Sequence, residues 1–324
     1  MFVEEKEIIE AEVNNEEAPK EETLENAPVE EKTPYQNIED QRLEFQHRLA
    51  KAKKRSKVFM GVVMLCLVGV IVGMSINQSI ILWISAGVAL AVSIISFIIN
   101  RRYERPDLNS YLFNYLNYCS EIYFKNSDFE DVNYERNIKL EINEVLLDAL
   151  YKDVAGIHSR NFNYGKYHDH TFNVCECDIL ARPTGSKRHN VMFLGKRIYM
   201  LNSLHLDQKY VIVLKGKEDT DLPDNLEGLH VLEEKDNMIV YGTEGADHKQ
   251  DLNKEFFKLI NKINHSGHIL NVNLVISASR SIAYLSYDQE AVDFPIDKPV
   301  NEELIKNCKK DVLNALAALE SLEK

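Results

Sequence analysis

The sequence lacks charge over one long stretch: residues 58–99, forty-two in all, contain no Asp, Glu, Lys, Arg or His. A helix on the surface of a water-soluble protein carries a polar face, so this stretch is not such a helix. Its two halves, residues 58–76 and 80–99, are nineteen and twenty residues long. As helices they would extend about 28 and 30 Å, which is the thickness of the hydrocarbon core of a bilayer. We therefore predict a transmembrane hairpin at residues 58–99.

The sequence also lacks the short motifs of common catalytic and nucleotide-binding sites. It contains no nucleophile elbow, Walker loop, dinucleotide fingerprint or His-Glu-x-x-His motif. Ionisable side chains, which mark ion and proton paths inside membranes, are absent from both spans. We therefore expect no cofactor, no metal site and no transport activity from a single chain, and the catalytic residues, if there are any, stay unknown.

Cysteine is scarce, with five residues in the chain: Cys66, Cys119, Cys175, Cys177 and Cys308. The number is odd, and none of them lies between the two spans. Disulfide frameworks use even numbers of cysteines in oxidising compartments. We therefore expect reduced thiols.

The chain has fewer basic than acidic residues, 38 against 51, which gives a formal net charge of -13. Residues 1–40 hold fourteen acidic residues against three lysines, so the acidity belongs to the amino-terminal tail. This distribution predicts no binding to nucleic acid, which needs a basic surface. The Glu-rich composition of residues 1–36 further predicts a disordered tail, because it offers too little apolar area to offset the entropy of ordering.

The charges that flank the hairpin predict its orientation. Only residues 77–79 join the two spans, so both ends of the chain must leave the bilayer on the same side. The flanking cations are Lys51, Lys53, Lys54, Arg55 and Lys57 before the first span, and Arg101, Arg102 and Arg105 after the second. The connection itself carries no charge. The positive-inside rule therefore places both termini in the cytoplasm, and the protein in the cytoplasmic membrane.

A basic juxtamembrane helix is expected at residues 37–57. Asn37 has the residue type of an N-cap, with Asp40 three residues later, and Phe45 and Leu49 continue a helical spacing toward the first span. The cations of this helix would attract an anionic leaflet. Their role in orienting the hairpin is already a sufficient reason for their presence, so recognition of a particular lipid is the alternative.

Small residues predict a close-packing face inside the hairpin. Gly69 and Gly73 form a small-xxx-small pair in the first span, and Ser85, Ala89 and Ser93 repeat at intervals of four in the second. Such faces let helix backbones approach each other in lipid. Packing within one hairpin and pairing between two chains both use this pattern, and the two alternatives stay open here.

Residues 107–324 are expected to form a cytosolic α+β domain with a mainly antiparallel sheet and packed helices. Helical spacing of apolar residues predicts one helix after Pro106 and a second that includes residues 142–150 and ends near Gly156. Alternating or short apolar runs then predict strands at residues 171–181, 191–201, 210–214, 229–233 and 238–241. The connections between some of them are too short for crossover helices, which indicates antiparallel pairing.

Three more elements are expected toward the carboxyl terminus. They are a helix at residues 247–263, a hairpin of strands at 269–277 and 281–287, and a final helix from Asn301 onward. The final helix repeats apolar residues at alternate threes and fours, which is the spacing of a coiled-coil seam. Leu304, Leu313 and Leu316 widen that apolar stripe, as in a helix that packs on the sheet of its own domain. Self-association is the alternative.

Residues 160–296 resemble a bacterial family of membrane proteins, the domain of unknown function 3137. The similar segments include Asn163-Tyr-Gly-Lys, Cys175-Glu-Cys, Val191-Met-Phe-Leu-Gly-Lys and a closing hairpin before Phe294-Pro. The resemblance implies a pair of membrane spans joined to a soluble domain of unassigned activity. It therefore adds to the expected architecture without adding chemistry. The paired cysteines beside Glu176 and the histidines before them depart from the family pattern.

Two groups in this region have residue types that are used in catalysis. His168, His170, Cys175 and Cys177 are potential metal ligands, but residues 168 and 175 of one strand would lie about 23 Å apart, which is too far for one zinc ion. Glu176 could act as a general base if it were buried. A lone carboxylate in a strand is more often structural.

These patterns predict a membrane-anchored interaction or sensory module that performs no catalysis. Its partners would be the lipid bilayer and either another protein or a second copy of the chain. The alternative function is that of a membrane-bound hydrolase or metal-dependent enzyme, which would use Glu176 with the neighbouring His or Cys side chains.

Overall fold

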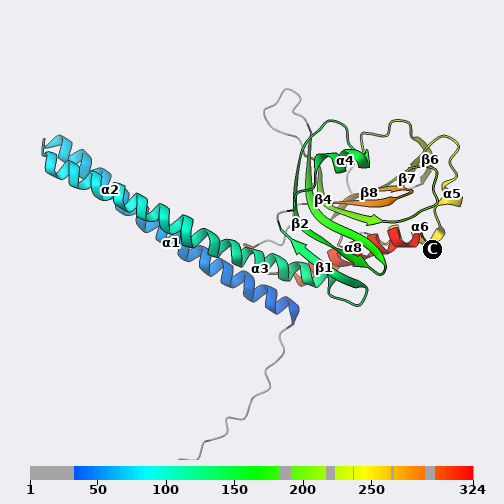
Figure 1. Ribbon diagram of the computed structural model, residues 1–324, viewed down its shortest axis with the longest axis horizontal. Coiled ribbons are helices and arrows are strands. Elements are labelled where there is room, and N and C mark those ends of the chain that lie inside the picture. The colour runs from blue at the N-terminus through cyan, green and yellow to red at the C-terminus, as the bar shows by residue number, and fades with distance from the viewer. Residues whose placement is uncertain are drawn as a thin grey trace, which may run out of the picture. The chain divides into compact units, whose positions relative to one another are not determined.

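The computed structural model describes residues 33–136, 138–181, 191–216, 223–235, 237–263, 266–288 and 296–323. Two long apolar helices come first in this part of the chain, and a domain built on one antiparallel sheet follows them (Figure 1). The protein is therefore α+β, as the sequence predicted. Residues 1–32 of the predicted disordered tail lie outside the described residues.

The first helix, α1 (Pro34–Ser75), joins the predicted juxtamembrane helix to the first span without a break. Its N-cap is Thr33, not Asn37 as predicted. The Thr33 side chain accepts a hydrogen bond from the backbone N–H of Gln36, and the Gln36 side chain accepts one from the backbone N–H of Thr33. Pro34 follows at a helix position where an N–H would have no partner. The tail predicted at residues 1–36 therefore ends earlier, since residues 34–36 are helical.

The second long helix also continues past its predicted end. It consists of α2 (Ser79–Ile99), a π-helical turn η1 (Asn100–Glu104) and α3 (Arg105–Phe124). The sequence predicted a separate helix after Pro106, and this separation was wrong. The π turn ends just before Pro106, so the missing N–H of proline falls in the first turn of α3, where it costs little. Each predicted span is therefore continuous with a helix on the basic side of the hairpin.

Within the described residues, nine strands form one sheet, and every hydrogen-bonded pair of neighbours is antiparallel. The strands are β1 (Phe129–Glu135), β2 (Val154–Tyr167), β3 (His170–Ala181), β4 (Val191–Leu201), β5 (Tyr210–Lys215), β6 (His230–Lys235), β7 (Met238–Gly242), β8 (Ile269–Ser277) and β9 (Arg280–Tyr287). Their spatial order is β1-β2-β3-β4-β9-β8-β5-β7-β6. The predicted antiparallel sheet is confirmed.

The sequence did not predict the strands β1 and β2, and the predicted end of the helix α4 was too late in the chain. β1 and β2 were missed because their many polar residues, among them Asn, Asp, Ser and Arg, hide the alternation that marks a half-buried strand. The helix α4 (Ile142–Asp148) ends at Ala149, which adopts a left-handed φ of 52°. The prediction that this helix ends near Gly156 was therefore wrong, since Gly156 lies in β2.

Helices cover both faces of the sheet (Figure 1). One apolar core packs the helices α6 (Lys254–Ile260) and α8 (Glu302–Ser321) on strand residues such as Val174 and Ile198. A second core lies on the opposite face, where Val145 of α4 meets Cys175, Phe193 and other strand residues. Each face is thus buried by residues that alternate along the same strands, as the pleat requires.

The carboxyl-terminal helix α8 is part of the first core. Ile305, Cys308, Val312, Ala315 and Leu319 are all buried there. Asn301 caps this helix by accepting a hydrogen bond from the backbone N–H of Leu304. The wide apolar stripe of α8 is therefore covered by its own domain.

The single helix predicted at residues 247–263 is two short helices, α5 (His248–Asp251) and α6. The break falls at Asn253, whose side chain accepts a hydrogen bond from the backbone N–H of Phe256 and so starts a new helix. Apolar spacing alone did not reveal this second cap.

Candidate functional site

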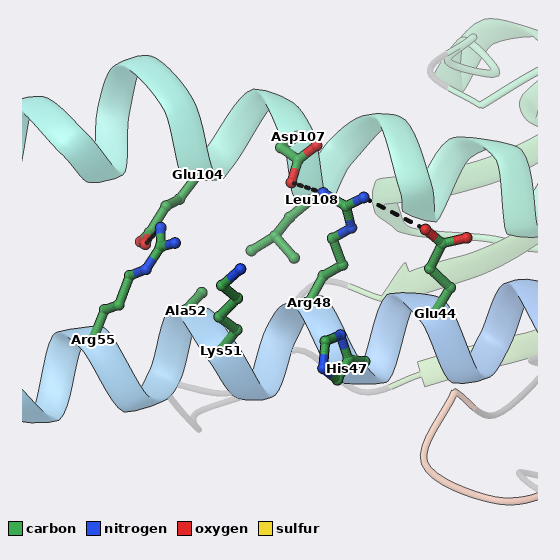
Figure 2. A pocket seen from close by; sticks show the side chains of 9 residues that line it. All are labelled: Glu44, His47, Arg48, Lys51, Ala52, Arg55, Glu104, Asp107 and Leu108. Atoms are coloured by element: carbon green, nitrogen blue, oxygen red, sulfur yellow. Dashed lines mark hydrogen bonds and ion pairs between the residues drawn. The ribbon is translucent and has the colours of Figure 1, made fainter.

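A cavity of about 280 Å³ lies between α1 and α3, on the basic side of the apolar stretches. Its lining residues are Glu44, His47, Arg48, Lys51, Ala52 and Arg55 of the first helix, with Glu104, Asp107 and Leu108 opposite them. Figure 2 shows that Arg48 and Arg55 reach across from α1 and that Lys51 lies between them. We call this cavity the juxtamembrane pocket, after the membrane spans that the sequence predicts at residues 58–76 and 80–99.

Arg48 bridges the two helices at one end of the juxtamembrane pocket. Its guanidinium donates to Asp107 of α3 at 3.2 Å and lies 3.5 Å from Glu44 of α1 (Figure 2). It also bonds to the hydroxyl of Tyr111 and lies 4.2 Å from the centre of that ring. Loss of hydration and a hydrogen bond to Glu44 raise the pKa of the Tyr111 hydroxyl, so this hydroxyl stays protonated at neutral pH. These contacts hold the guanidinium in place.

Arg55 closes the other end of the pocket. Its Nη1 donates to a carboxylate oxygen of Glu104 at 3.2 Å, and Glu104 lies in the π-helical turn. The side chain of Arg55 is half exposed and that of Glu104 is largely covered. The π turn therefore presents its carboxylate toward the cavity.

Lys51 differs from its two cationic neighbours. Within the described part of the chain it makes no hydrogen bond and no ion pair, although it lines the same cavity as three carboxylates. Those carboxylates are held by Arg48 and Arg55. The pocket therefore contains one cation with no partner of opposite charge.

A second contact joins the base of the two long helices to the sheet domain. Ile38 of α1 and Tyr115 of α3 are buried together, and Ile296 and Val300 pack against them. Arg42 donates to the carbonyl oxygen of Ile296 at 3.1 Å, and the backbone N–H of Val300 donates to Glu39 at 3.0 Å. We call this contact the base clamp.

The base clamp is an ionic as well as an apolar contact. Arg42 also pairs with Glu39, one turn earlier in α1, and its own side chain is buried. The hydrogen bond from Arg42 lowers the pKa of the Glu39 carboxyl, and the bond from Val300 lowers it further, against an opposing effect of burial. Since α8 begins at Glu302, two residues after Val300, the clamp lies next to the amino-terminal end of that helix.

The predicted membrane-flanking cations divide into two groups. Arg55 and Lys51 line the juxtamembrane pocket. All eight are exposed, and the other six do not line the pocket: Lys53, Lys54, Lys57, Arg101, Arg102 and Arg105. All eight fit the predicted orientation of the hairpin equally well, because nothing in a charge count reveals which cations face a neighbouring helix.

Of the two glycines predicted to form a close-packing face, Gly69 faces another small residue and Gly73 does not. A Cβ atom built on Gly69 would lie 2.5 Å from the hydroxyl oxygen of Ser85, so these two predicted residues face each other within one chain. A Cβ on Gly73 would lie 2.8 Å from the backbone nitrogen of Leu82, which is not a small residue. Ser93 is exposed, and its hydroxyl donates to the carbonyl oxygen of Ala89 in the same helix.

Glu176 is buried with its oxygens already engaged. It accepts hydrogen bonds from Lys196 at 2.9 Å, Arg160 at 3.2 Å and Asn161 at 2.8 Å. It lies on the face of the sheet that α8 covers, since Val174 on the same side of β3 belongs to that core. Three donors that hold one carboxylate fit a structural ion pair better than a general base, which needs a free lone pair near its substrate.

The two histidines and the two cysteines of β3 and the turn before it do not lie together in the fold. His168 and His170 face Glu320 and Glu323 at the end of α8, at 3.1 and 3.5 Å. Cys175 and Cys177 belong to the core on the opposite face. Among the described residues there is no cluster of three His, Cys, Asp or Glu side chains that could hold a metal ion.

The sequence did not predict one buried network of hydrogen-bonded side chains. Arg197 of β4 donates to the carboxylate of Asp148 in α4 at 3.0 Å, and Tyr284 of β9 bonds to the same carboxylate. Burial raises the pKa of the Tyr284 hydroxyl, so it donates this bond. The signal in the sequence was the adjacent pair Lys196 and Arg197 in an otherwise apolar strand, which places one cation on each face.

Comparisons with known proteins give no relative: no family model matches the chain, and neither does a curated protein or a solved structure. The resemblance to the domain of unknown function 3137 therefore stays an untested prediction.

Proposed function

We propose that the two long apolar helices span a membrane as a hairpin and anchor a cytosolic domain that serves as an interaction or sensory module. The two helices are long and apolar enough to cross a bilayer. Exposure of their side chains supports insertion. Leu65, Ile80 and Trp83 are 75%, 73% and 72% exposed, whereas a core helix of a water-soluble protein would bury such residues. An apolar surface of this extent needs lipid or a partner to cover it.

The positions of two aromatic side chains, Trp83 and Tyr103, also support insertion of the two helices into a bilayer. Trp83 lies near the uncharged end of the hairpin, and Tyr103 lies in the π turn near its basic end; both are exposed. Twenty residues of continuous helix separate them, which is a rise of about 30 Å. This distance matches a hydrocarbon core, and Trp and Tyr are the residues enriched at its two boundaries. The Lys and Arg residues that flank the basic end, and not the aromatic residues, indicate that this end would face the cytoplasm.

The base clamp is the observation that carries the proposed role of the domain. A simple tether would join anchor and domain by a flexible linker. Here the bond from Arg42 to Ile296 connects the anchor to the segment that starts α8, and α8 in turn is buried on the sheet. A change in the packing of the membrane helices would therefore reach the sheet domain through a continuous set of contacts, which supports a sensory or interaction role.

The engagement of Glu176 argues against the alternative of a hydrolase. Its carboxylate is occupied by Lys196, Arg160 and Asn161, under the cover of a helix. The proposed module would instead act by binding a protein partner, another membrane component or a second copy of the chain.

Cysteine accessibility tests the membrane topology. Ser79 lies at the start of α2 near the uncharged tip, and Ser127 is exposed between α3 and β1. In intact cells an impermeant thiol reagent should label Ser79→Cys and leave Ser127→Cys unlabelled until the cells are opened. Labelling of Ser127→Cys in intact cells would overturn the orientation, and release of the protein by alkaline carbonate would overturn insertion itself.

A further inference from the structure

The juxtamembrane pocket has a charge arrangement that orientation of the hairpin does not require. Positive-inside topology needs a surplus of Lys and Arg near the span, not a cavity that gathers some of them. Yet Arg48 and Arg55 are held on either side of an empty volume, and Lys51 lines the same volume with no partner among the described residues. The volume of about 280 Å³ is far larger than the space of a single water molecule.

The carboxylates of the pocket position its arginines and do not neutralise its surroundings. Glu104 holds Nη1 of Arg55, and Asp107 holds Nη1 of Arg48. The other nitrogens of Arg55 have no hydrogen-bond partner among the described residues, so this guanidinium keeps donors for a ligand. Over residues 44–57 and 100–108 there are nine Lys and Arg against three Asp and Glu. The field around the pocket therefore attracts an anion.

The pocket also lies at the depth of lipid headgroups if the hairpin spans as proposed. Arg55 and Lys51 precede the apolar stretch that starts at Val58 by three and seven residues, a rise of about 4.5 and 10 Å along a continuous helix. The headgroup region on each side of a bilayer is roughly 5–8 Å thick. Long cationic side chains extend toward this layer. The Arg55 end of the cavity would thus lie at the level of the phosphates of one leaflet, and the Lys51 side chain is long enough to extend to that level.

We propose that the juxtamembrane pocket binds the phosphate group of an anionic membrane lipid. In this arrangement Lys51 supplies the uncompensated charge, Arg55 donates hydrogen bonds from its remaining nitrogens, and Asp107 and Glu104 orient the two guanidinium groups. Charge-assisted bonds of this type are the strong ones in phosphate recognition. This proposal rests on membrane insertion of the hairpin, and it deepens the proposed function by naming a lipid as one ligand of the anchor.

The chain offers a matched control for this site. Lys53 carries the same charge on the same helix and is exposed, as Lys51 is, but it does not line the pocket. A general attraction between cations and an anionic leaflet would count both lysines equally. A built phosphate site would depend on Lys51 alone.

The test uses the full chain reconstituted in phosphatidylcholine nanodiscs with a minor fraction of spin-labelled phosphatidylglycerol. Electron paramagnetic resonance measures the fraction of labelled lipid that the protein restricts. We expect Lys51→Gln to weaken the relative affinity for phosphatidylglycerol on the order of tenfold, and Lys53→Gln to leave it nearly unchanged. Circular dichroism checks that both variants keep their helix content.

Three outcomes would overturn the inference. Equal losses in the two variants would show that the attraction is general, and no loss in either would show that the pocket binds no lipid phosphate. A second arm adds inorganic phosphate to pure phosphatidylcholine nanodiscs and measures acetylation of Lys51 against Lys53. If inorganic phosphate protects Lys51 but not Lys53 from acetylation, and Lys51→Gln does not change the affinity for labelled phosphatidylglycerol in the first arm, the pocket binds a soluble phosphate and not a lipid. Failure of the wild-type chain to enter the bilayer would instead refute the proposed anchor.

Discussion

Arg42 donates a hydrogen bond to the carbonyl oxygen of Ile296, 254 residues later in the chain, at 3.1 Å. The guanidinium is buried, and its other contact is the carboxylate of Glu39 in the same helix. Buried charges are stable only when paired and hydrogen-bonded. Together with Glu39, which accepts from the backbone N–H of Val300, and Gln46, which donates to the same carbonyl oxygen, this side chain links the first long helix to the segment before the last one.

Replacement of Arg42 by Met should loosen the base clamp. The change removes one of two donors to the carbonyl oxygen of Ile296, since the side-chain amide of Gln46 also donates to it, and it leaves Glu39 with the backbone N–H of Val300. We expect faster amide hydrogen exchange at residues 296–301 and a loss of about 1–3 kcal/mol in the free energy of local opening. Lys53→Met, at an exposed position of the same helix, should change neither. Unchanged exchange in Arg42→Met would remove the clamp as a route between anchor and domain.

Gly195→Ala should disrupt the pairing of β4 with β9. A Cβ atom at this position would lie 2.0 Å from the backbone carbonyl oxygen of Leu285, so one strand must move. The expected cost is about 3 kcal/mol or more in the free energy of unfolding, measured by denaturant titration. Gly156→Ala is the matched control in a strand, because its Cβ would meet only a methyl carbon of Leu180 at 3.9 Å. Similar stability of the two variants would contradict the close approach.

Glu176→Gln should destabilise the domain and leave no other phenotype. The variant removes the carboxylate charge that pairs with the buried ammonium of Lys196 at 2.9 Å, for which the expected cost is about 3 kcal/mol. Glu234→Gln removes a carboxylate from an exposed pair with Lys215 and should cost less than about 0.5 kcal/mol. Loss of a cellular function in Glu176→Gln at unchanged thermal stability would instead favour the hydrolase.

Leu319→Ala tests whether α8 serves the core of its own domain. Leu319 is fully buried there, so the truncation should cost about 3 kcal/mol. The mass of the protein in detergent solution, measured by light scattering, should not change. Leu147→Ala, at a 65% exposed helix position, should change neither property. A wild-type dimer that becomes a stable folded monomer in Leu319→Ala would show that α8 serves assembly.

The ion pairs of Glu233 should make the free energy of unfolding of the domain depend on pH in the acidic range. Hydrogen bonds from Lys235 and then His248 lower the pKa of Glu233 to about 2, from an ordinary 4.5. The folded state therefore binds fewer protons than the unfolded state between these pH values. Its contribution to stability is complete above pH 4.5 and is lost as the pH falls toward 2.

Glu233→Gln should accordingly lower the free energy of unfolding by about 1–2 kcal/mol at pH 7, after allowance for solvent screening. The difference from the wild type should shrink as the pH falls from 4.5 and vanish near pH 2. Unfolding by urea at a series of pH values measures it, with Glu234→Gln as the control. A difference that is constant with pH would refute the ionic contribution.

Local patterns in the sequence determined the classes of the elements. The uncharged run of residues 58–99 predicted two apolar helices, because no polar face was left for water. The alternation in residues 191–201 predicted β4 with its observed bounds. The three-four spacing of apolar residues predicted the final helix from Asn301 onward, and the structure places Asn301 at its N-cap.

Only the tertiary structure decided which of these elements meet. β9 and β8 lie between β4 and β5 in the sheet, and no local period encodes that order. The same holds for the base clamp, for the pairing of Glu176 with Lys196, and for the pocket that separates Lys51 from Lys53. Contacts between residues far apart in the chain depend on how whole apolar faces pack, and packing is a property of the folded chain that no short window of sequence contains.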